Sequence, residues 1–179
     1  MKPNSHSNSE RLEQAFDRYY PALFRYFRYR GADADTANDL ASATFERALK
    51  NLAGYDPRRS QIQTWLFAIA RNLSINHWKA ASNHTIAPLD EDMPIPDDPP
   101  LEQAVVLIED KEQILSAVQT LDERAREILA LKFGGPLTNR QIAGLTGLTE
   151  SNVGIILYRS LLKLRTLLTS AQMEARDDR

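Results

Sequence analysis

The segment TNRQIAGLTGLTESNVGIILYRSLLKLR, residues 138–165, has the residue spacing of two helices that cross at a tight turn. Ala143 is small where the helices would meet, Gly147 follows where the turn favours positive φ, and Val153 is placed as a core residue of the second helix. Thr149 can cap that helix by accepting a backbone N–H with its hydroxyl. The pattern is typical of a helix-turn-helix, whose second helix usually enters the DNA major groove. An ordinary helical hairpin is the alternative.

The composition limits the classes of protein to which the chain can belong. Its 179 residues, 42% of them hydrophobic, are enough for one large or two small domains with real cores. No apolar run approaches the roughly 18 residues of a membrane span, and the polar N-terminus lacks a signal-peptide core. We therefore expect a cytoplasmic protein without membrane insertion. Without cysteine, and with three scattered histidines, the chain is expected to hold no metal and no cofactor.

Charge divides the chain into three parts, although its net charge is only −2. Residues 1–80 contain 12 Lys and Arg against 8 Asp and Glu, residues 81–105 contain none against 6, and residues 106–179 contain 10 of each. The middle part also contains five prolines, which oppose helix and core formation. We expect a tether that lets a basic and a neutral module bind far apart on an elongated target, or a passive spacer.

Apolar residues recur at steps of three and four along both modules, and no window alternates with a period of two. This pattern predicts an all-α fold of two small helical domains joined by a Pro-rich acidic linker. The expected boundaries are residues 1–9 for a disordered N-terminus, 10–80 for the first domain, 81–105 for the linker, 106–170 for the second domain and 171–179 for a C-terminal tail.

The expected core of the first domain comes from one face of each helix. The expected core residues are Phe16, Tyr20, Leu23 and Phe27 in the first helix and Phe45, Ala48, Leu49 and Leu52 in the second. The interleaved arginines of the first helix, Arg18, Arg25, Arg28 and Arg30, are expected to be solvated, with a nucleic-acid surface as the alternative.

Four segments, taken in order, resemble the bacterial extracytoplasmic-function sigma factors. DLASATFERAL from Asp39 and TWLFAIARNLSINHWK from Thr64 resemble region two of that family. LDERAREILALKF from Leu121 and QIAGLTGLTESNVGIILYRSLLKLR from Gln141 resemble its region four. The resemblance implies a subunit that binds the clamp and flap of core RNA polymerase, melts and holds the minus-ten element of promoter DNA, and reads the minus-thirty-five duplex. It also implies control by an anti-sigma factor.

The resemblance assigns roles to four sets of residues. Binding of core polymerase is assigned to Asp39, Leu40, Ser42 and Glu46. Binding of minus-ten DNA is assigned to Tyr55, Arg58, Arg59, Arg71, Asn72, Asn76 and Lys79. Binding of minus-thirty-five DNA is assigned to Arg140, Thr149, Glu150, Ser151, Asn152, Gly154, Ile155, Tyr158, Arg159 and Lys163. An apolar stripe opposite the core of the last helix, Ile155, Tyr158 and Leu162, is expected to contact the anti-sigma factor.

Three positions depart from the family pattern. Ser42 replaces a common glutamine, and Asn76 replaces a common aspartate, which removes a negative charge near the bound strand. Gly154 begins a run of three residues where many relatives have basic or hydroxyl residues. Base reading is therefore expected to depend more on the neighbouring polar residues, such as Asn152, which can pair with adenine. Tyr55 could stack on an unpaired base, although a buried aromatic is the alternative.

Three other functions remain as alternatives to the promoter-specificity subunit. A stand-alone DNA-binding regulator would use only the helix-turn-helix and would leave the first-domain resemblance unexplained. An enzyme with an appended DNA-binding domain is not expected, because the sequence has no Gly-rich phosphate loop, nucleophile–base pair or acidic metal cluster. A helical interaction protein would lack salt-dependent affinity for promoter DNA.

Overall fold

The computed structural model of the chain describes residues 5–81 and 111–177. The linker expected at 81–105 and the start of the second expected domain therefore lie outside the described residues, apart from Ala81. The described part is helical and contains no strand, which confirms the all-α prediction. Within those two ranges, no helix is both long and apolar enough to cross a membrane.

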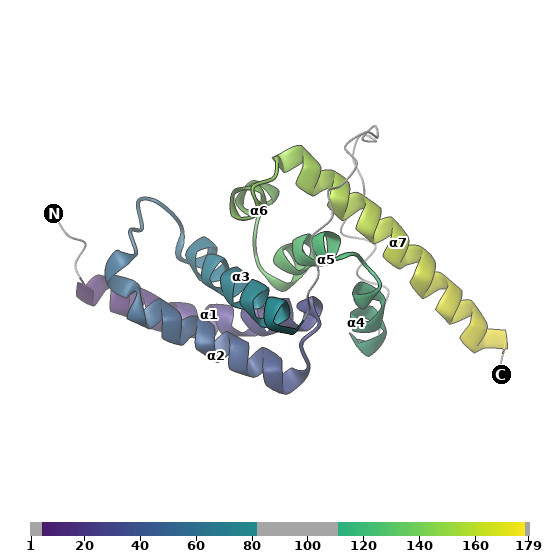
Figure 1. Cartoon of the computed structure of the whole chain (residues 1–179), viewed down its shortest axis with the longest axis horizontal. Coiled ribbons are helices and arrows are strands. Elements are labelled where there is room, and N and C mark those ends of the chain that lie inside the picture. Colours follow the sequence, from purple (N-terminus) through teal and green to yellow (C-terminus); the bar gives the residue numbers. More distant parts are fainter. Residues whose placement is uncertain (1–4, 82–110, 178–179) are drawn as a thin grey trace.

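The first module contains three α-helices and a short 3-10 turn. These are α1, Ser5–Arg30; α2, Ala34–Lys50; η1, Leu52–Gly54; and α3, Ile62–Ala81. α1 thus begins inside the segment expected to be disordered. α1 and α2 run side by side, and α3 packs against both (Figure 1). α2 begins after Asp33, whose carboxylate accepts the backbone N–H of Thr36 at 2.7 Å, and this bond lowers the pKa of Asp33.

Two residues expected in the core of the first module are exposed, so the expectation is wrong for both: Leu49 is 62% and Phe16 45% exposed. The buried face of α2 consists of Ala37, Ala41, Thr44, Phe45 and Ala48. Leu49 is rotated about 100° from Ala48 around the helix axis and falls outside that face. Phe16 lies at the edge of α1, where its ring contacts Tyr20 and Phe45 at centroid distances of 5.1 and 4.8 Å without being covered.

Within residues 111–177, the second module contains four α-helices and one π-helical turn. These are α4, Lys111–Gln119; α5, Glu123–Leu129; η2, Ala130–Gly134; α6, Asn139–Thr146; and α7, Glu150–Asp177. α7 continues through residues expected to form a tail, and its C-terminal part extends away from the other helices (Figure 1). α5 begins after Asp122, whose carboxylate accepts the backbone N–H of Ala125 at 2.9 Å.

The turn between α6 and α7 has the geometry that the sequence predicts for a helix-turn-helix. Gly147 ends α6 in the left-handed region with φ of 76°, and Ala143 and Val153 are both buried. The Thr149 hydroxyl accepts the backbone N–H of Asn152 at 3.2 Å, which confirms its capping role. α6 also starts with an unanticipated capping box, in which the Thr138 N–H donates to the Gln141 side chain at 2.8 Å.

Replacing Thr138 with alanine is expected to lower the free energy of unfolding by about 1 kcal/mol, because the backbone N–H of Gln141 loses its acceptor. Urea denaturation followed by circular dichroism measures the change. Thr166→Ala is the matched control, since the exposed Thr166 hydroxyl donates to the Leu162 carbonyl of its own helix and caps no helix start. Equal losses in the two variants would contradict a capping contribution from Thr138.

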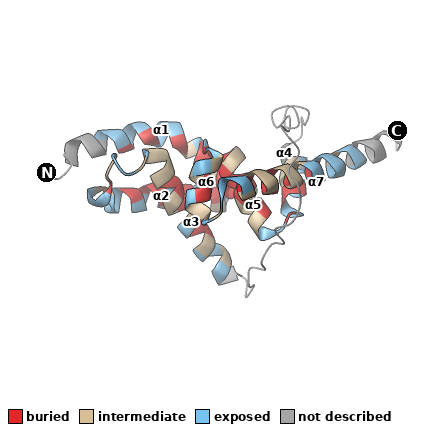
Figure 2. Ribbon diagram, turned by 90° about the horizontal axis from the view of Figure 1, so that it is seen from above, coloured by how far each residue is buried: buried red, intermediate tan, exposed pale blue. Residues whose placement is uncertain are grey.

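The two modules pack against each other and share one hydrophobic core. Figure 2 shows buried residues continuing from α1 and α3 into α5 and α6. Two glycines permit a close approach between the modules: a Cβ on Gly134 would lie 2.6 Å from Cα of Tyr26, and a Cβ on Gly135 would lie 2.7 Å from the Phe67 ring. Only residues without a side chain allow the η2 turn to lie this close to α1 and α3. The charge pattern along the chain does not predict this packing.

Candidate nucleic-acid interface

One face of α3 carries a strip of exposed polar side chains. Asn72, Asn76 and Lys79 are exposed and are separated by four and three residues, so they project from the same side of the helix. The opposite side is buried through Leu66, Phe67, Ala70 and Leu73. Amide groups both donate and accept hydrogen bonds, and a lysine adds positive charge. The strip therefore has the chemistry needed to hold unpaired bases and their phosphates.

The loop that precedes α3 presents arginines and keeps its tyrosine inside. Tyr55 is 3% exposed, its ring lies 4.8 Å from that of Trp65, and its hydroxyl donates to the carbonyl of Ser60 at 3.2 Å. Arg58 and Arg59 are exposed. The Arg58 guanidinium donates to both carboxylate oxygens of the neighbouring aspartate, Asp56, at 3.2 Å, and these bonds lower the pKa of Asp56. Tyr55 thus supports the loop and does not offer its ring face to a base in this structure.

Arg71 is separated from the polar strip of α3. Its Nε lies 2.9 Å from Oε1 of Glu127 on α5, and the two side chains are only 23% and 13% exposed. The structure therefore brings Asn72, Asn76 and Lys79 together along one face, but directs Arg71 towards the second module.

The residues assigned to core-polymerase binding lie on the outer side of α2. Asp39, Ser42 and Glu46 are exposed, and Leu40 is half-buried. The Ser42 hydroxyl lies 3.2 Å from the hydroxyl of Tyr20, so the serine at this unusual position is held by α1. The exposed part of this face is acidic and polar.

The start of α7 carries the exposed residues of the helix-turn-helix. Arg140 and Glu150 are 88% and 58% exposed, with Nε and Oε2 3.8 Å apart. Ser151 is also exposed, and Asn152 is half-buried. A Cβ on Gly154 would meet no atom within 4 Å, so this position is open on the outer face of the helix. This end of the helix is free to approach another molecule closely.

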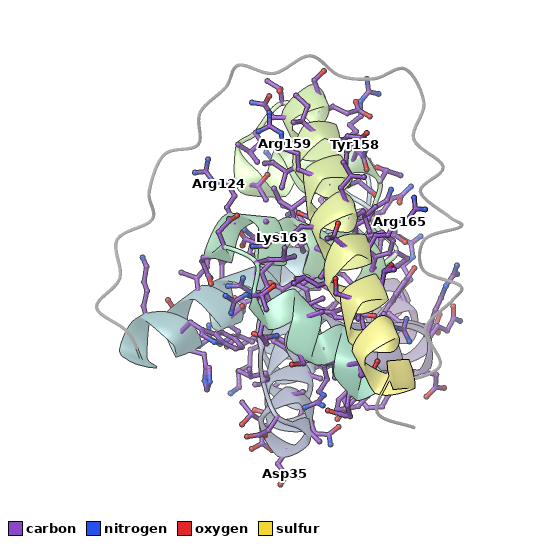
Figure 3. The ribbon with its side chains drawn as sticks, turned by 90° about the vertical axis from the view of Figure 1, so that its right-hand side faces the viewer. Asp35, Arg124, Tyr158, Arg159, Lys163 and Arg165 are labelled. Atoms are coloured by element: carbon purple, nitrogen blue, oxygen red, sulfur yellow. The ribbon has the colours of Figure 1, made fainter. Side chains whose placement is uncertain are left out.

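The middle of α7 carries basic side chains on both of its sides (Figure 3). Figure 3 shows Tyr158 and Arg165 on one side of the helix and Arg159 and Lys163 on the other, with Arg124 of α5 beside the latter pair. The Lys163 ammonium donates to the carbonyl of Thr120 at 3.0 Å and thereby also supports the α4–α5 connection.

The apolar stripe expected on α7 is only partly uncovered. Leu162 is 47% exposed, whereas Ile155 and Tyr158 are half-buried. Leu162 therefore contributes the largest exposed apolar surface of the three.

Replacing Gly154 with arginine is expected to increase affinity for duplex DNA and to steepen the dependence of log K on log salt by about 1, because the new guanidinium can meet a phosphate. Fluorescence anisotropy over a salt series measures the slope. Thr169→Arg, which adds the same charge at an exposed position in the distal part of α7, is the control. Equal slopes for the two variants would contradict the placement of the α7 start against DNA.

A group of charged residues lies between the modules and was not predicted from the sequence. Arg30, expected to be solvated, is 1% exposed and forms an ion pair with Glu123 of α5. The signal was present in the spacing: Arg30 continues the three- and four-residue steps of the buried positions Leu23 and Phe27. Its partner on α5 could not be identified, because nothing local to α1 indicates which helix of the second module covers it.

Each of the two modules matches the model of a known protein family. Residues 15–84 match the family model of sigma-70 region 2, and residues 111–164 match that of sigma-70 region 4. The chain is 27% identical over 168 residues to the RNA polymerase sigma factor YlaC of Bacillus subtilis, covering 92% of this chain and 96% of that protein. It is 29% identical over 159 residues to the ECF RNA polymerase sigma factor BldN of Streptomyces coelicolor, covering 86% of this chain and 58% of that protein.

Solved structures share the fold of both modules. CnrH, determined in complex with the cytosolic domain of CnrY, superposes with a TM-score of 0.65 and 21% identity, covering 93% of this chain and 92% of that one. The sigma factor RpoE of Bartonella quintana, determined with the anti-sigma factor NepR, superposes with a TM-score of 0.67 and 19% identity, covering 89% and 98%. Region 2 thus coincides with α1–α3 and region 4 with α4–α7, in the family order. The chain belongs to the sigma-70 family, among its extracytoplasmic-function (ECF) RNA polymerase sigma factors.

Proposed function

We propose that this chain is a promoter-specificity subunit of RNA polymerase, which acts in the cytoplasm, directs the core enzyme to particular promoters and helps to open the duplex. The observation that carries the proposal is the pair of exposed polar faces, one on α3 and one at the start of α7, on modules that match regions 2 and 4. The chain itself supplies no catalytic step in this proposal; polymerisation belongs to the core enzyme.

The α3 strip is proposed to hold the minus-ten element after melting. Asn72 and Asn76 offer donors and acceptors for exposed base edges, and Lys79 offers positive charge for the backbone. Arg58 and Arg59 extend this surface from the preceding loop with exposed guanidinium groups. Capture of flipped bases removes them from the closed duplex and so favours the open form.

The start of α7 is proposed to read the minus-thirty-five duplex. Asn152 and Arg159 have side chains suited to adenine and guanine, and Glu150 can accept from the amino group of cytosine. Ser151 and Arg140 complete an exposed polar end of the helix-turn-helix. The open space at Gly154 permits close contact between the helix backbone and DNA.

Two protein partners complete the proposal. Asp39, Ser42 and Glu46 on α2 form the polar surface proposed for the polymerase clamp, while the second module meets the flap. An anti-sigma factor is proposed to cover the exposed part of the α7 stripe at Leu162. The support is that an exposed leucine on a helix face lowers solubility unless a partner covers it. The alternative, a stand-alone DNA-binding regulator, is disfavoured because it gives the region 2 module no role.

Run-off transcription tests the proposed function. Core RNA polymerase is incubated with a genomic promoter library, with and without the purified chain, and the new transcript starts are mapped. We expect chain-dependent starts that share two upstream sequence elements. Specific duplex binding without polymerase, together with no chain-dependent start, would instead establish the stand-alone regulator.

A further inference from the structure

The loop between η1 and α3 contains a turn that its sequence favours. Asp56 and Pro57 occupy the first two positions, where aspartate and proline are common, and the backbone N–H of Arg59 donates to the Asp56 carbonyl at 3.0 Å. The backbone N–H of Arg58 also donates to Oδ1 of Asp56, at 3.0 Å. The loop arches out from the helices of the first module (Figure 1). The turn therefore presents its side chains away from the hydrophobic core.

A buried tyrosine anchors this turn to α3. Tyr55 directly precedes the turn, and its hydroxyl donates to the carbonyl of Ser60, directly after the turn, at 3.2 Å. Its ring lies 4.8 Å from that of Trp65 on α3 and is only 3% exposed. The ring of Tyr55 thus fixes both ends of the turn but is not accessible to a base. A flat surface that this loop offers to a base therefore belongs to another residue.

Arg58 presents such a flat surface, because its guanidinium is held in one orientation. Nε and Nη2 donate to Oδ1 and Oδ2 of Asp56, both at 3.2 Å, and two parallel bonds of this kind fix the guanidinium plane. The same bonds raise the pKa of Arg58 and lower that of Asp56, so both groups stay charged. The Arg58 side chain is nevertheless 79% exposed. One edge of the guanidinium is therefore occupied while its faces are open to solvent.

The ion pair changes what Arg58 can offer to single-stranded DNA. The Asp56 carboxylate lies within hydrogen-bond distance, far closer than the Debye length of about 10 Å at 0.1 M salt. A phosphate that approaches Arg58 therefore meets repulsion as well as attraction. A base meets no such opposition, because it can stack on the face of a guanidinium through π and cation–π interactions. Fixing the plane before binding also reduces the conformational entropy that is lost on binding.

We propose that Arg58 is a stacking platform for one unpaired base, and that Asp56 is the positioning residue that keeps the face of the guanidinium open. The inference rests on the proposed function, because unpaired bases reach this loop only if the first module binds melted DNA. Asp56 itself contacts no DNA and acts through Arg58. The two neighbouring arginines thereby take different roles: Arg58 offers a face to a base, and the exposed Arg59 offers charge to the backbone.

Two oligonucleotides of equal length separate stacking from phosphate binding. One consists of thymidines and the other of abasic sites, so they carry the same phosphates and differ only in their bases. Fluorescence anisotropy gives the affinity of the full chain for each, and their ratio is the base preference. Arg58→Lys keeps the charge but removes the plane, so it should weaken binding of the thymidine oligonucleotide about tenfold and leave binding of the abasic one unchanged. Arg58→Tyr removes the charge but supplies a ring, so it should retain the base preference.

The same lysine substitution at Arg59 is the matched control. Arg59→Lys preserves the charge on the adjacent exposed residue and should leave both affinities unchanged. Circular dichroism verifies that each variant retains its helix content.

Asp56→Asn tests the positioning role without removing the turn. The side-chain oxygen of asparagine can still accept the backbone N–H of Arg58, but it no longer provides a carboxylate for the guanidinium. We expect a lower base preference, tighter binding of the abasic oligonucleotide and a salt slope that is steeper by about 0.7, because the released guanidinium can meet a phosphate. In an Arg58→Tyr background, Asp56→Asn should change neither affinity, since Asp56 acts only through Arg58. A merely structural role for Asp56 would lower both affinities in either background.

Two results would overturn the proposal. The first is a wild-type chain with no preference for the thymidine oligonucleotide. The second is an Arg58→Lys variant that binds both oligonucleotides like the wild type while Arg58→Tyr loses affinity for both, which would identify Arg58 as a phosphate contact. Neither measurement needs a promoter or polymerase. Failure of run-off transcription with an intact, Arg58-dependent base preference would therefore count against the proposed function alone.

Discussion

Replacing Phe67 with alanine is expected to lower the free energy of unfolding by about 3–5 kcal/mol, the usual cost of truncating a fully buried phenylalanine. Phe67 of α3 is 0% exposed, and its ring meets that of Tyr26 edge-on at a centroid distance of 5.7 Å. The ring also lies against the backbone at Gly135, where an added Cβ would be 2.7 Å away. The cavity is thus bounded by backbone and by a buried ring, which limits its collapse.

Urea denaturation followed by circular dichroism measures this loss, and Phe16→Ala is its control. The same atoms are deleted in the control, but Phe16 is 45% exposed and its ring contacts those of Tyr20 and Phe45 at the surface. We expect the control to lose about 1 kcal/mol, because much of its ring already contacts water. A loss at Phe67 no larger than that at Phe16 would show that the contact between α3 and the η2 turn contributes little to stability.

The features that were predictable from the sequence are those set by neighbouring residues. Gly147 and Thr149 determine the turn and the cap of the helix-turn-helix through their own backbone and side chain, and both have the expected geometry. Asp122 caps α5 in the same local way, by accepting the backbone N–H of Ala125. A cap depends on a hydrogen bond three residues away, so the sequence contains both partners side by side.

The features that were not predictable depend on the packing of distant segments. The exposure of Leu49 follows from which face of α2 meets α1, and a one-residue difference in that face moves a leucine into solvent. The pairing of Arg30 with Glu123 joins residues 93 positions apart. Gly134 and Gly135 matter because α1 and α3 lie against them. In the sequence, two glycines followed by a proline indicate only the end of a helix. Among the candidate site residues, this same packing directs Arg71 away from the α3 strip.

Replacing Asn72 and Asn76 together with alanine is expected to reduce promoter opening about 100-fold while leaving the fold intact. Each amide that reads a base edge contributes about 1–3 kcal/mol of binding, so the loss of two such contacts accounts for a change of this size. Both side chains are exposed, so their truncation creates no cavity. Permanganate reactivity of unpaired thymines, measured with core polymerase and a promoter identified by run-off transcription, reports the open duplex. The control truncates two exposed amides away from α3, Gln14→Ala with Gln113→Ala.

A promoter that is already unpaired at the minus-ten element distinguishes base capture from a general loss of polymerase function. Wild-type holoenzyme gains little from such a template, because it opens the duplex itself. If Asn72 and Asn76 act by holding flipped bases, the double variant should regain part of its activity there, since the energy of unpairing no longer has to come from the missing contacts. It should also retain wild-type binding to a duplex containing only the minus-thirty-five element, which the start of α7 reads independently. Normal promoter opening by the double variant would show that the α3 strip is not part of the minus-ten site. An equal loss of activity on duplex and unpaired templates would show that the α3 strip acts in polymerase docking.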